Sequence, residues 1–568
     1  MFYFQPLINC VSPKKITIEE NEMITHKLWI KVSVLLAIVL IVTACAPQAV
    51  SETKPPPTAQ PASTVSPTIE QVFTVAVARD PGPLNPHDTV SIFPALSMIY
   101  ESLVVYNDDG TIGPGLAKSW DISPDGTTYT FHLREGVTFH DGTPFNAAAV
   151  KWNLDRWLSD PAWSSIPFWN KVVKESIQAP DDYTITFKLT EPYFATLQEF
   201  TFTRPPRILS PSSVNGSGEL ANPLGTGAWK VGEYVPQQRM VFVPYEKYWG
   251  DKPKLTKVVF EVISDPQARI NALLSGEVNL IGGEYVGGIP LESIPVLKQN
   301  PNVRIVTGEG GSTFAIGMNF TKPPFNDKTV RQAISYAVDR KIIAEQLFSG
   351  YATEAKGVFP PSVRYMSYPH PELYAYAPDK AKDLLAQAGW VAGSDGIVEK
   401  DGVKFETELL VDAEAYPQSK SMSEVIQAQL REVGIDVKLR LVDYGAWSDA
   451  LRSSNYGMAT WVTYGPPYDP QTGLGYLFNY SLLEMSDDGT IFGDPELDAL
   501  REAAFRTTTE EERQAAFNKV WDFMDLNMGS VPVVYSVRLY AVDSRVQGFK
   551  LGSTEYWLDL NQVTMGTK

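Results

Sequence analysis

A short apolar stretch that ends in a cysteine, residues 32–45, constrains the fold of this chain more than any other feature. Lys27 and Lys31 place positive charge directly before it. A basic start, an apolar segment of about ten residues and small residues at its end are typical of a cleaved export signal. We therefore expect residues 1–44 to be removed, with Met23 as the better-placed translation start, and the fold to be built from the remainder.

The end of this stretch resembles the lipidation site of bacterial lipoproteins, because the small residues 42–44 stand directly before Cys45. That resemblance implies a lipid attached to Cys45. The alternative is an uncleaved membrane anchor, but the stretch is shorter than the roughly 20 apolar residues that a spanning helix needs. Residues 45–69 are rich in proline and predict an extended tether between the lipid and the folded part.

Composition narrows the remaining possibilities. The chain has two cysteines, Cys10 and Cys45, so we expect the exported fold to have neither a disulfide nor a thiolate metal site. The net charge of −18 argues against nucleic-acid binding, which needs basic patches. The part after residue 44 is longer than one hydrophobic core usually supports, and we therefore expect two or more domains.

The sequence pattern predicts a strand-rich segment followed by α/β segments. Residues 128–133 alternate apolar and polar side chains, as a half-buried strand does, and 183–189 repeat the pattern. One helix is expected near 147–158. Further along, a strand over 257–263, a helix between Asp265 and Gly276 and a strand over 278–281 favour parallel pairing.

Similar signals recur towards the C-terminus. Asp327, Asp379 and Ser421 each stand where a helix N-cap would, and Thr507–Thr509 precede acidic residues that start a late helix. Residues 435–441 and 531–535 predict further strands. The glycine-rich run 308–311 lacks the lysine of a phosphate loop, and we interpret it as a flexible crossing between lobes.

Candidate chemistry is sparse. His87, His132, His140 and His370 are not spaced as a metal pair, and His132 and His140 are expected to be solvated. His87 follows a proline-rich turn and is a weak candidate for a ligand contact. The sequence contains no serine-nucleophile elbow and no phosphate-binding loop, which makes enzymatic activity a minor alternative.

Two features suggest a ligand site. The proline-rich loop 461–470 carries Trp461, Tyr464 and Tyr468, and rigid aromatic loops often form ligand walls. A structural turn whose rings cover a core edge is an equal alternative. Arg204 lies in another proline-rich stretch, where it could bind a ligand carboxylate with two hydrogen bonds or form an ion pair between lobes.

An ordered series of motifs resembles family 5 of the solute-binding proteins of ABC importers, the peptide- and nickel-binding type. It covers about residues 70–568, in motifs at 100–104, 116–120, 123–131, 133–145, 223–227 and 330–339. The resemblance implies an α/β fold of two lobes, the type II periplasmic-binding-protein fold (cluster C), with an inserted third subdomain. Carried onto this chain, lobe I would comprise 70–106, 223–312 and 533–568, the inserted subdomain 107–222, and lobe II 313–532.

Within the family, the chain is most similar to the branch that binds nickel or metallophores. The resemblance implies that Arg204 binds chelator carboxylates, that Trp163, Tyr464 and Tyr468 form an aromatic box, and that Phe93 stands near the position of a methionine. The branch's second carboxylate-binding arginine has no match in 159–163, and its metal-ligand histidine is missing from 471–495. Pro466 replaces the aspartate with which peptide binders pair a peptide amine, which disfavours a peptide ligand.

The resemblance therefore implies an exported, lipid-anchored binding protein, not an enzyme, on the outer face of the cell membrane or in the periplasm. Its ligand is expected to be a carboxylate-bearing nickel or cobalt chelate that supplies its own metal ligands, with no resident cofactor. Its partners would be the transmembrane subunits of an ABC permease, and it would act as a monomer. The alternatives are a di- or oligopeptide ligand and, in a different class, a surface enzyme or adhesin on the same scaffold.

Overall fold

The computed structural model describes residues 71–87, 92–160, 168–319, 322–412, 418–463, 465–475, 495–527 and 529–566. All of them belong to one compact unit, 69–568. Cys45, Trp163 and Tyr464 lie outside the described residues, as do the expected export signal and tether. Among the helices that are described, none combines the length and the apolar character needed to cross a membrane.

A mixed sheet of eleven strands runs through the described part of the chain. It joins strands from the beginning, middle and end of the sequence, and β13 (Thr353–Glu354) pairs with β20 beside the main path. In spatial order the strands are β18 (Asp436–Val442), β17 (Glu406–Asp412), β19 (Met458–Val462), β12 (Val303–Met318), β20 (Ser530–Asp543), β11 (Leu280–Gly282), β1 (Val72–Val77), β10 (Lys257–Val262), β9 (Arg239–Pro244) and β8 (Trp229–Val235).

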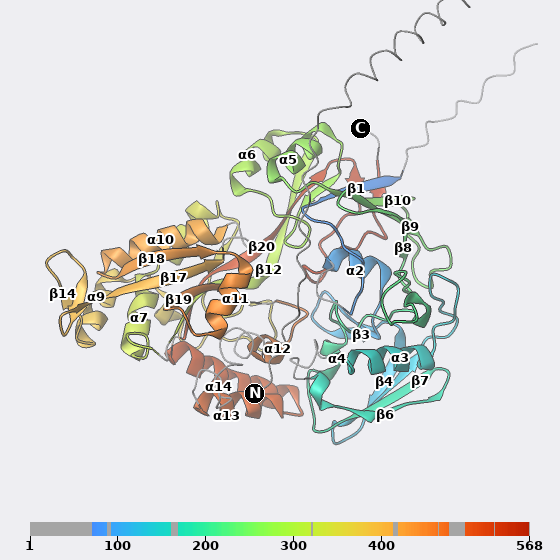
Figure 1. The fold of residues 1–568 in the computed structure, drawn as a ribbon, viewed down its shortest axis with the longest axis horizontal. Helices are drawn as coiled ribbons and strands as arrows, with labels where there is room; N and C mark the ends of the chain where they lie inside the picture. The colour runs from blue at the N-terminus through green and yellow to red at the C-terminus, as the bar shows by residue number, and fades with distance from the viewer. Residues whose placement is uncertain are drawn as a thin grey trace, which may run out of the picture. The chain divides into compact units, whose positions relative to one another are not determined.

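Two long antiparallel strands, β12 and β20, connect the two ends of this sheet (Figure 1). The first half of β12 pairs with the second half of β20, and a register shift between Glu309 and Thr313 separates this ladder from the next. The glycine-rich run 308–311 therefore lies inside a strand, at the irregular point of the ladder. The sequence predicts a flexible crossing here, but the structure has a β-strand instead.

Separate hydrophobic cores lie at the two ends of the sheet. One core is built on β1, β10, β9 and β8 with α2 (Phe93–Ile99). A smaller one packs α5 (Pro266–Ser275) and α6 (Ile294–Gln299) near β11. The other end packs β17, β19 and the start of β20 against α7 (Lys328–Ala337), α9 (Pro378–Gln387) and α10 (Gln418–Glu432). The residue boundaries predicted for the two lobes and the inserted subdomain stay a prediction.

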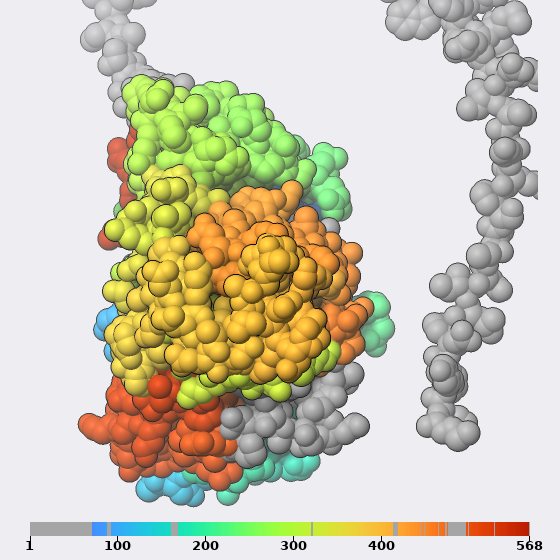
Figure 2. Space-filling view, turned by 90° about the vertical axis from the view of Figure 1, so that its left-hand side faces the viewer, coloured from blue at the N-terminus to red at the C-terminus, as the bar shows by residue number. Residues whose placement is uncertain are grey.

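A four-stranded antiparallel sheet with its own core forms within the strand-rich segment. Tyr129, Phe131 and Leu133 are buried on one face of β5, which confirms the predicted alternation. The strand order is β4 (Ala117–Ile122), β5 (Thr128–Leu133), β7 (Thr184–Leu189) and β6 (Val172–Asp181), and α3 (Ala147–Trp157) packs beside them. Figures 1 and 2 place α13 (Pro495–Phe505) and α14 (Glu510–Asn527) next to this sheet.

Several predicted helix boundaries are confirmed. The Asp265 side chain accepts a hydrogen bond from the Ala268 amide, and Gly276 ends α5 in the left-handed region. Strands β10 and β11 are parallel, as expected, but β1 lies between them. Asp327 caps α7, and α14 begins after Thr509.

Two predicted helix starts are wrong. Helix α9 begins at Pro378 because proline suits the first helical turn, which places Asp379 inside the helix. Helix α10 extends to Gln418, so Ser421 is not its cap. The Ser423 hydroxyl donates to the Ser419 carbonyl oxygen, a local bond that accommodates small polar residues within the helix.

Short elements complete the described fold. They are β2 (Val104–Tyr106), β3 (Ile112–Pro114), α4 (Thr196–Glu199), α8 (Arg340–Ile342), β14 (Val391–Ala392), β15 (Val398–Lys400), β16 (Val403–Lys404), α11 (Tyr444–Arg452), α12 (Pro470–Gly475), β21 (Val546–Gln547) and β22 (Thr564–Met565).

Candidate functional site

The candidate site begins at the carboxyl ends of parallel strands, where open α/β sheets bind ligands. Strand β1 leads into a loop and then α2, whose first residue is Phe93. Strand β11 leads into Glu284 and Tyr285. The rings of Phe93 and Tyr285 meet edge to face, with centroids 4.9 Å apart. The two strand ends therefore supply one shared wall.

Aromatic rings from five distant segments meet here, and we call Phe93, Phe202, Tyr285, Tyr468 and Tyr556 the aromatic cluster. The Tyr556 ring lies 5.2 Å from Phe93, 4.9 Å from Tyr285 and 5.4 Å from Tyr468. The Phe202 ring contacts Tyr468 at 4.4 Å. Such contacts are typical of ligand pockets, which aromatic side chains line more often than polar ones.

Arg204 contributes a positive charge to the aromatic cluster. Its guanidinium carbon lies 4.6 Å from the Phe93 ring centroid, and the side chain is half-buried. Within the described part of the chain, its guanidinium forms neither a hydrogen bond nor an ion pair. The ion pair between lobes that the sequence left open is therefore not formed there, and the donors of Arg204 are available to an anionic ligand.

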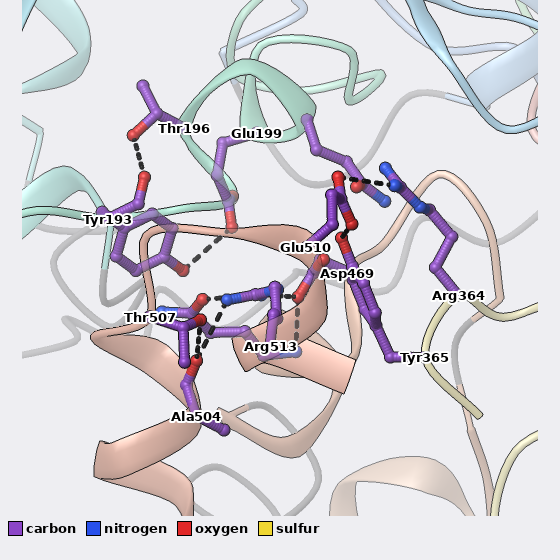
Figure 3. A network of polar contacts seen from close by, with 12 residues as sticks. Tyr193, Thr196, Glu199, Arg364, Tyr365, Asp469, Ala504, Thr507, Glu510 and Arg513 are labelled. Atoms are coloured by element: carbon purple, nitrogen blue, oxygen red, sulfur yellow. Dashed lines mark hydrogen bonds and ion pairs between the residues drawn. The ribbon is translucent and has the colours of Figure 1, made fainter. Parts of the chain in front are cut away.

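Buried polar contacts fix the loop that carries Tyr468 (Figure 3). Arg513 and Asp469 form a buried ion pair, with 2.6 Å between Nη2 and Oδ1. Arg513 also donates to Gln471 and to the Ala504 carbonyl oxygen. From α4, the Gln198 amide donates to the Pro467 carbonyl oxygen. The loop is thus held from both sides before any ligand contacts it.

Close backbone contact fixes the same loop against β12. A Cβ atom on Gly465 would lie 2.1 Å from the Gly311 Cα, and one on Gly311 would lie 2.6 Å from the Gly465 Cα. Only glycine at both positions permits this approach without a shift of backbone. The glycine-rich run of β12 therefore has a packing role at the site.

Two carboxylates, Glu284 and Glu555, stand next to members of the aromatic cluster. Glu284 is accessible to solvent, but partial dehydration by the surrounding protein and the charge of Glu555 raise its pKa well above the ordinary value. Glu555 is buried and accepts hydrogen bonds from the Gly311 amide and the Ser312 hydroxyl. Burial raises the pKa of Glu555, although these bonds and Arg538 oppose the rise.

The other predicted contact residues are not brought into the aromatic cluster by any described contact. Trp461 is buried in β19, where its indole nitrogen donates to the Ser530 hydroxyl. His87 is buried against Trp157, and its ring nitrogens lie within hydrogen-bond distance of Arg156 and of the Arg207 carbonyl oxygen. Burial lowers the pKa of His87 to about 3, so its imidazole is neutral.

The sequence predicts a solvated His140 side chain, but the structure partly buries its ring. Its Nε2 lies 2.9 Å from the Gly227 carbonyl oxygen, and burial lowers its pKa to about 4. The hairpin end that carries it packs against 225–227, a contact that no local pattern predicts. His132 keeps a partly exposed contact with Asp121.

The sequence reasoning missed Phe202, Tyr285, Tyr556 and both carboxylates. One signal was available, because glycines surround Glu284 and Tyr285 directly after a predicted strand. Such a loop brings backbone close to a ligand or to packed rings. Tyr556 carries no comparable signal.

A separate cavity of about 230 Å³ lies between α2 and residues 557–561. Of the two acidic residues that line it, Glu101 accepts hydrogen bonds from Thr226, Tyr248 and Trp249, and Asp559 accepts one from the Asn561 amide. Because donors of the protein already contact both carboxylates, this cavity offers less unpaired charge than Arg204 does. Among the residues that the structure describes, no group of three or more His, Cys, Asp or Glu side chains could hold a metal ion.

Comparison with known proteins gives consistent matches. The model of the bacterial extracellular solute-binding proteins, family 5, matches residues 111–481. The nickel-binding periplasmic protein of Escherichia coli K12 is 35% identical over 476 residues, which are 82% of this chain and 88% of that one. The glutathione-binding protein GsiB of Pectobacterium atrosepticum is 30% identical over 77% of this chain and 84% of its own.

A solved structure supports the same assignment. NikA from Brucella suis, crystallised with Fe(III)-EDTA, superposes with a TM-score of 0.81 at 32% identity, covering 87% of this chain and 99% of that one. This likeness confirms the predicted two-lobed type II fold.

Proposed function

Because the chain belongs to family 5 of the bacterial extracellular solute-binding proteins, we propose that it captures a small carboxylate-bearing nickel or cobalt chelate and delivers it unaltered to an ABC permease. Membership of this family makes it a substrate-binding component of transport and not an enzyme. Metal is cargo in this proposal, held by the chelator and not by protein ligands.

One observation carries the choice of ligand. Arg204 presents a guanidinium with no anionic partner among the described residues, directly over Phe93 in a cluster of five aromatic rings. A ligand with a carboxylate and an apolar face satisfies both. A chelate of a transition metal with carboxylate arms has this form, and the nickel-binding and Fe(III)-EDTA-bound relatives support it.

We propose that capture proceeds by closure of lobes I and II, as divided above, about β12 and β20. The contacts of Gln198 with Pro467 and of Phe202 with Tyr468 join the inserted subdomain to lobe II. Closure that buries the ligand lets its binding energy stabilise the shape that the permease recognises. We further propose a monomer, exported and anchored by lipid at Cys45, whose replacement by serine should release the protein from the membrane fraction.

Replacement of Arg204 tests the ligand contact. Loss of a hydrogen bond to a charged group costs about 1.5–3 kcal/mol, so Arg204→Ala should weaken binding roughly 10- to 150-fold. Calorimetric titration with nickel(II) citrate and with nickel(II) L-histidine measures this effect. Arg239→Ala removes an exposed cation paired with Glu233 and is the matched control. Unchanged affinity in Arg204→Ala would remove this residue from the site.

The ligand class is tested directly on protein purified from its own host. Native mass spectrometry with metal analysis should find nickel or cobalt together with a small organic acid. Recovery of an oligopeptide without metal would replace the chelate by the peptide alternative, which the glutathione-binding relative supports.

A further inference from the structure

Glu284 is a carboxyl group without a partner beside the aromatic cluster. Among the described residues it forms no ion pair and no side-chain hydrogen bond, although Lys and Arg side chains pair with many other acids of this chain. Its neighbour Tyr285 contacts Phe93 and Tyr556, and Arg204 contacts the same Phe93 ring. An unpaired carboxyl group and an unpaired cation thus share one cluster.

A buried hydroxyl next to this position also lacks a partner. The Tyr556 side chain is 2% exposed, and its hydroxyl makes no hydrogen bond with any described group. Tyr285 interacts with this phenol without reaching the geometry of a hydrogen bond. Leaving a buried hydroxyl unpaired costs about 1–3 kcal/mol, which indicates that a polar group of the ligand completes the site.

The same hydroxyl lies within electrostatic reach of both carboxylates. Burial and the charges of Glu555 and Glu284 are among the causes that raise the pKa of Tyr556. Glu555 already accepts from Gly311 and Ser312, whereas Glu284 is accessible to solvent. Glu284 is therefore the member of the pair that is free to contact a ligand.

The two unpaired groups restrict the ligand. A chelator with carboxylates at both ends satisfies Arg204 but brings another anion to Glu284, where dehydration and the charge of Glu555 already raise the pKa and disfavour negative charge. A ligand with a carboxylate at one end and an amine at the other satisfies both. Amine N–H groups serve as donors whether the nitrogen is protonated or coordinated to a metal.

We propose that Glu284 binds the amine of an amino-carboxylate ligand whose carboxylate is bound by Arg204, so that the wall at the end of β11 replaces the acid missing at Pro466. This inference rests on the proposed function and narrows its ligand class. It includes metal complexes of amino acids as well as free amino-carboxylates, which share this chemistry.

Calorimetry on the full-length chain separates these cases with three probes: nickel(II) L-histidine, reduced glutathione and nickel(II) citrate. Glu284→Gln removes the ionisable carboxyl group and keeps the shape, and it should weaken binding of the amine-bearing probes at least tenfold while citrate binding stays equal or tightens. Glu277→Gln neutralises an exposed acid before β11 and should change every affinity less than twofold.

The outcomes distinguish the two proposals. Binding of nickel(II) L-histidine that Arg204→Ala weakens and Glu284→Gln leaves unchanged overturns the role of Glu284 and keeps the proposed function. Tight binding of nickel(II) citrate alone has the same meaning. Wild-type protein that binds none of the three probes overturns both proposals. Selective loss of nickel(II) L-histidine binding in Glu284→Gln supports both proposals. Selective loss of glutathione binding, without binding of either nickel probe by the wild type, supports the role of Glu284 and overturns the chelate.

Discussion

The ion pair between Asp469 and Arg513 should be worth far more to stability than the neighbouring surface pair in the same network (Figure 3). Both side chains are fully shielded from solvent, with exposures of 2% and 0%. Removing one partner of a buried pair typically costs about 3–5 kcal/mol, because the other charge stays buried without compensation. The two possible single variants differ in what they leave behind.

Asp469→Asn leaves the Arg513 guanidinium with neutral acceptors on Gln471 and Ala504. The ring of Phe194 also lies 4.7 Å from the guanidinium carbon and still stabilises the charge. We therefore expect a cost near the low end of the range, about 3 kcal/mol. Arg513→Met leaves the Asp469 carboxylate with the Gln471 backbone N–H as its donor, and the cost should approach about 5 kcal/mol.

Urea unfolding followed by tryptophan emission measures these costs, and the double variant gives the coupling energy. The double variant should be more stable than the sum of the single losses by at least about 1.5 kcal/mol, because neither charge remains unpaired. Glu510→Gln, which neutralises the half-exposed partner of Arg364, is the control and should cost less than about 1 kcal/mol. Single losses that add without coupling, or that equal the control, would refute the reasoning.

Two further predictions concern positions near the site. The pKa of His87, lowered by burial to about 3, lies below its ordinary value of about 6.5, so the unfolded chain takes up this proton first as pH falls. The wild type should therefore lose up to about 3 kcal/mol between pH 6.5 and pH 4, and His87→Gln should lack that loss without altering ligand affinity; an unchanged pH slope in urea unfolding would contradict this. Gly283→Ala should cost about 2–4 kcal/mol in the same assay, because φ is +85° and a Cβ would lie 2.5 Å from the Tyr540 ring. Gly288→Ala, where a Cβ meets open space, is the control, and an equal cost in both variants would show that the contact with Tyr540 is irrelevant.

Local signals predicted the elements better than they predicted the site. The N-cap of Asp265 and the left-handed Gly276 are decided within one helix, and both were predictable. Arg204 and Tyr468 were predicted from their proline-rich stretches and again from family motifs, and Phe93 from family motifs alone; the structure brings the three close to one cluster. The sequence places Trp461 in the same loop, but it lies in strand β19 and faces a core, because alternate residues of a strand point to opposite sides.

The missed residues depend on contacts between distant segments. Tyr285 follows β11 and Tyr556 follows β20, and these strands become neighbours only when Leu280 pairs with Val542. No spacing along the chain encodes that pairing. The wrong starts of α9 and α10 have a local cause, since Asp379 and Ser421 are typical caps that the structure accommodates inside a helix.

Segments that carry residues of the candidate site contact strand β12 directly. Glu555 bonds to Gly311 and Ser312, which lie at the register shift of β12, and the Gly311 backbone touches Gly465 of the loop that carries Tyr468. The segments of Tyr468 and Tyr556 both contact β12 at this point, so we expect a change in the angle between the two ends of the strand to shift these rings. Conversely, a ligand that fixes those rings and binds Arg204 and Glu284 would select one geometry of β12. In the proposed function, capture and closure are thus one physical event, because Tyr468 and Tyr556 lie on segments that contact β12, the strand about which we propose that the lobes close.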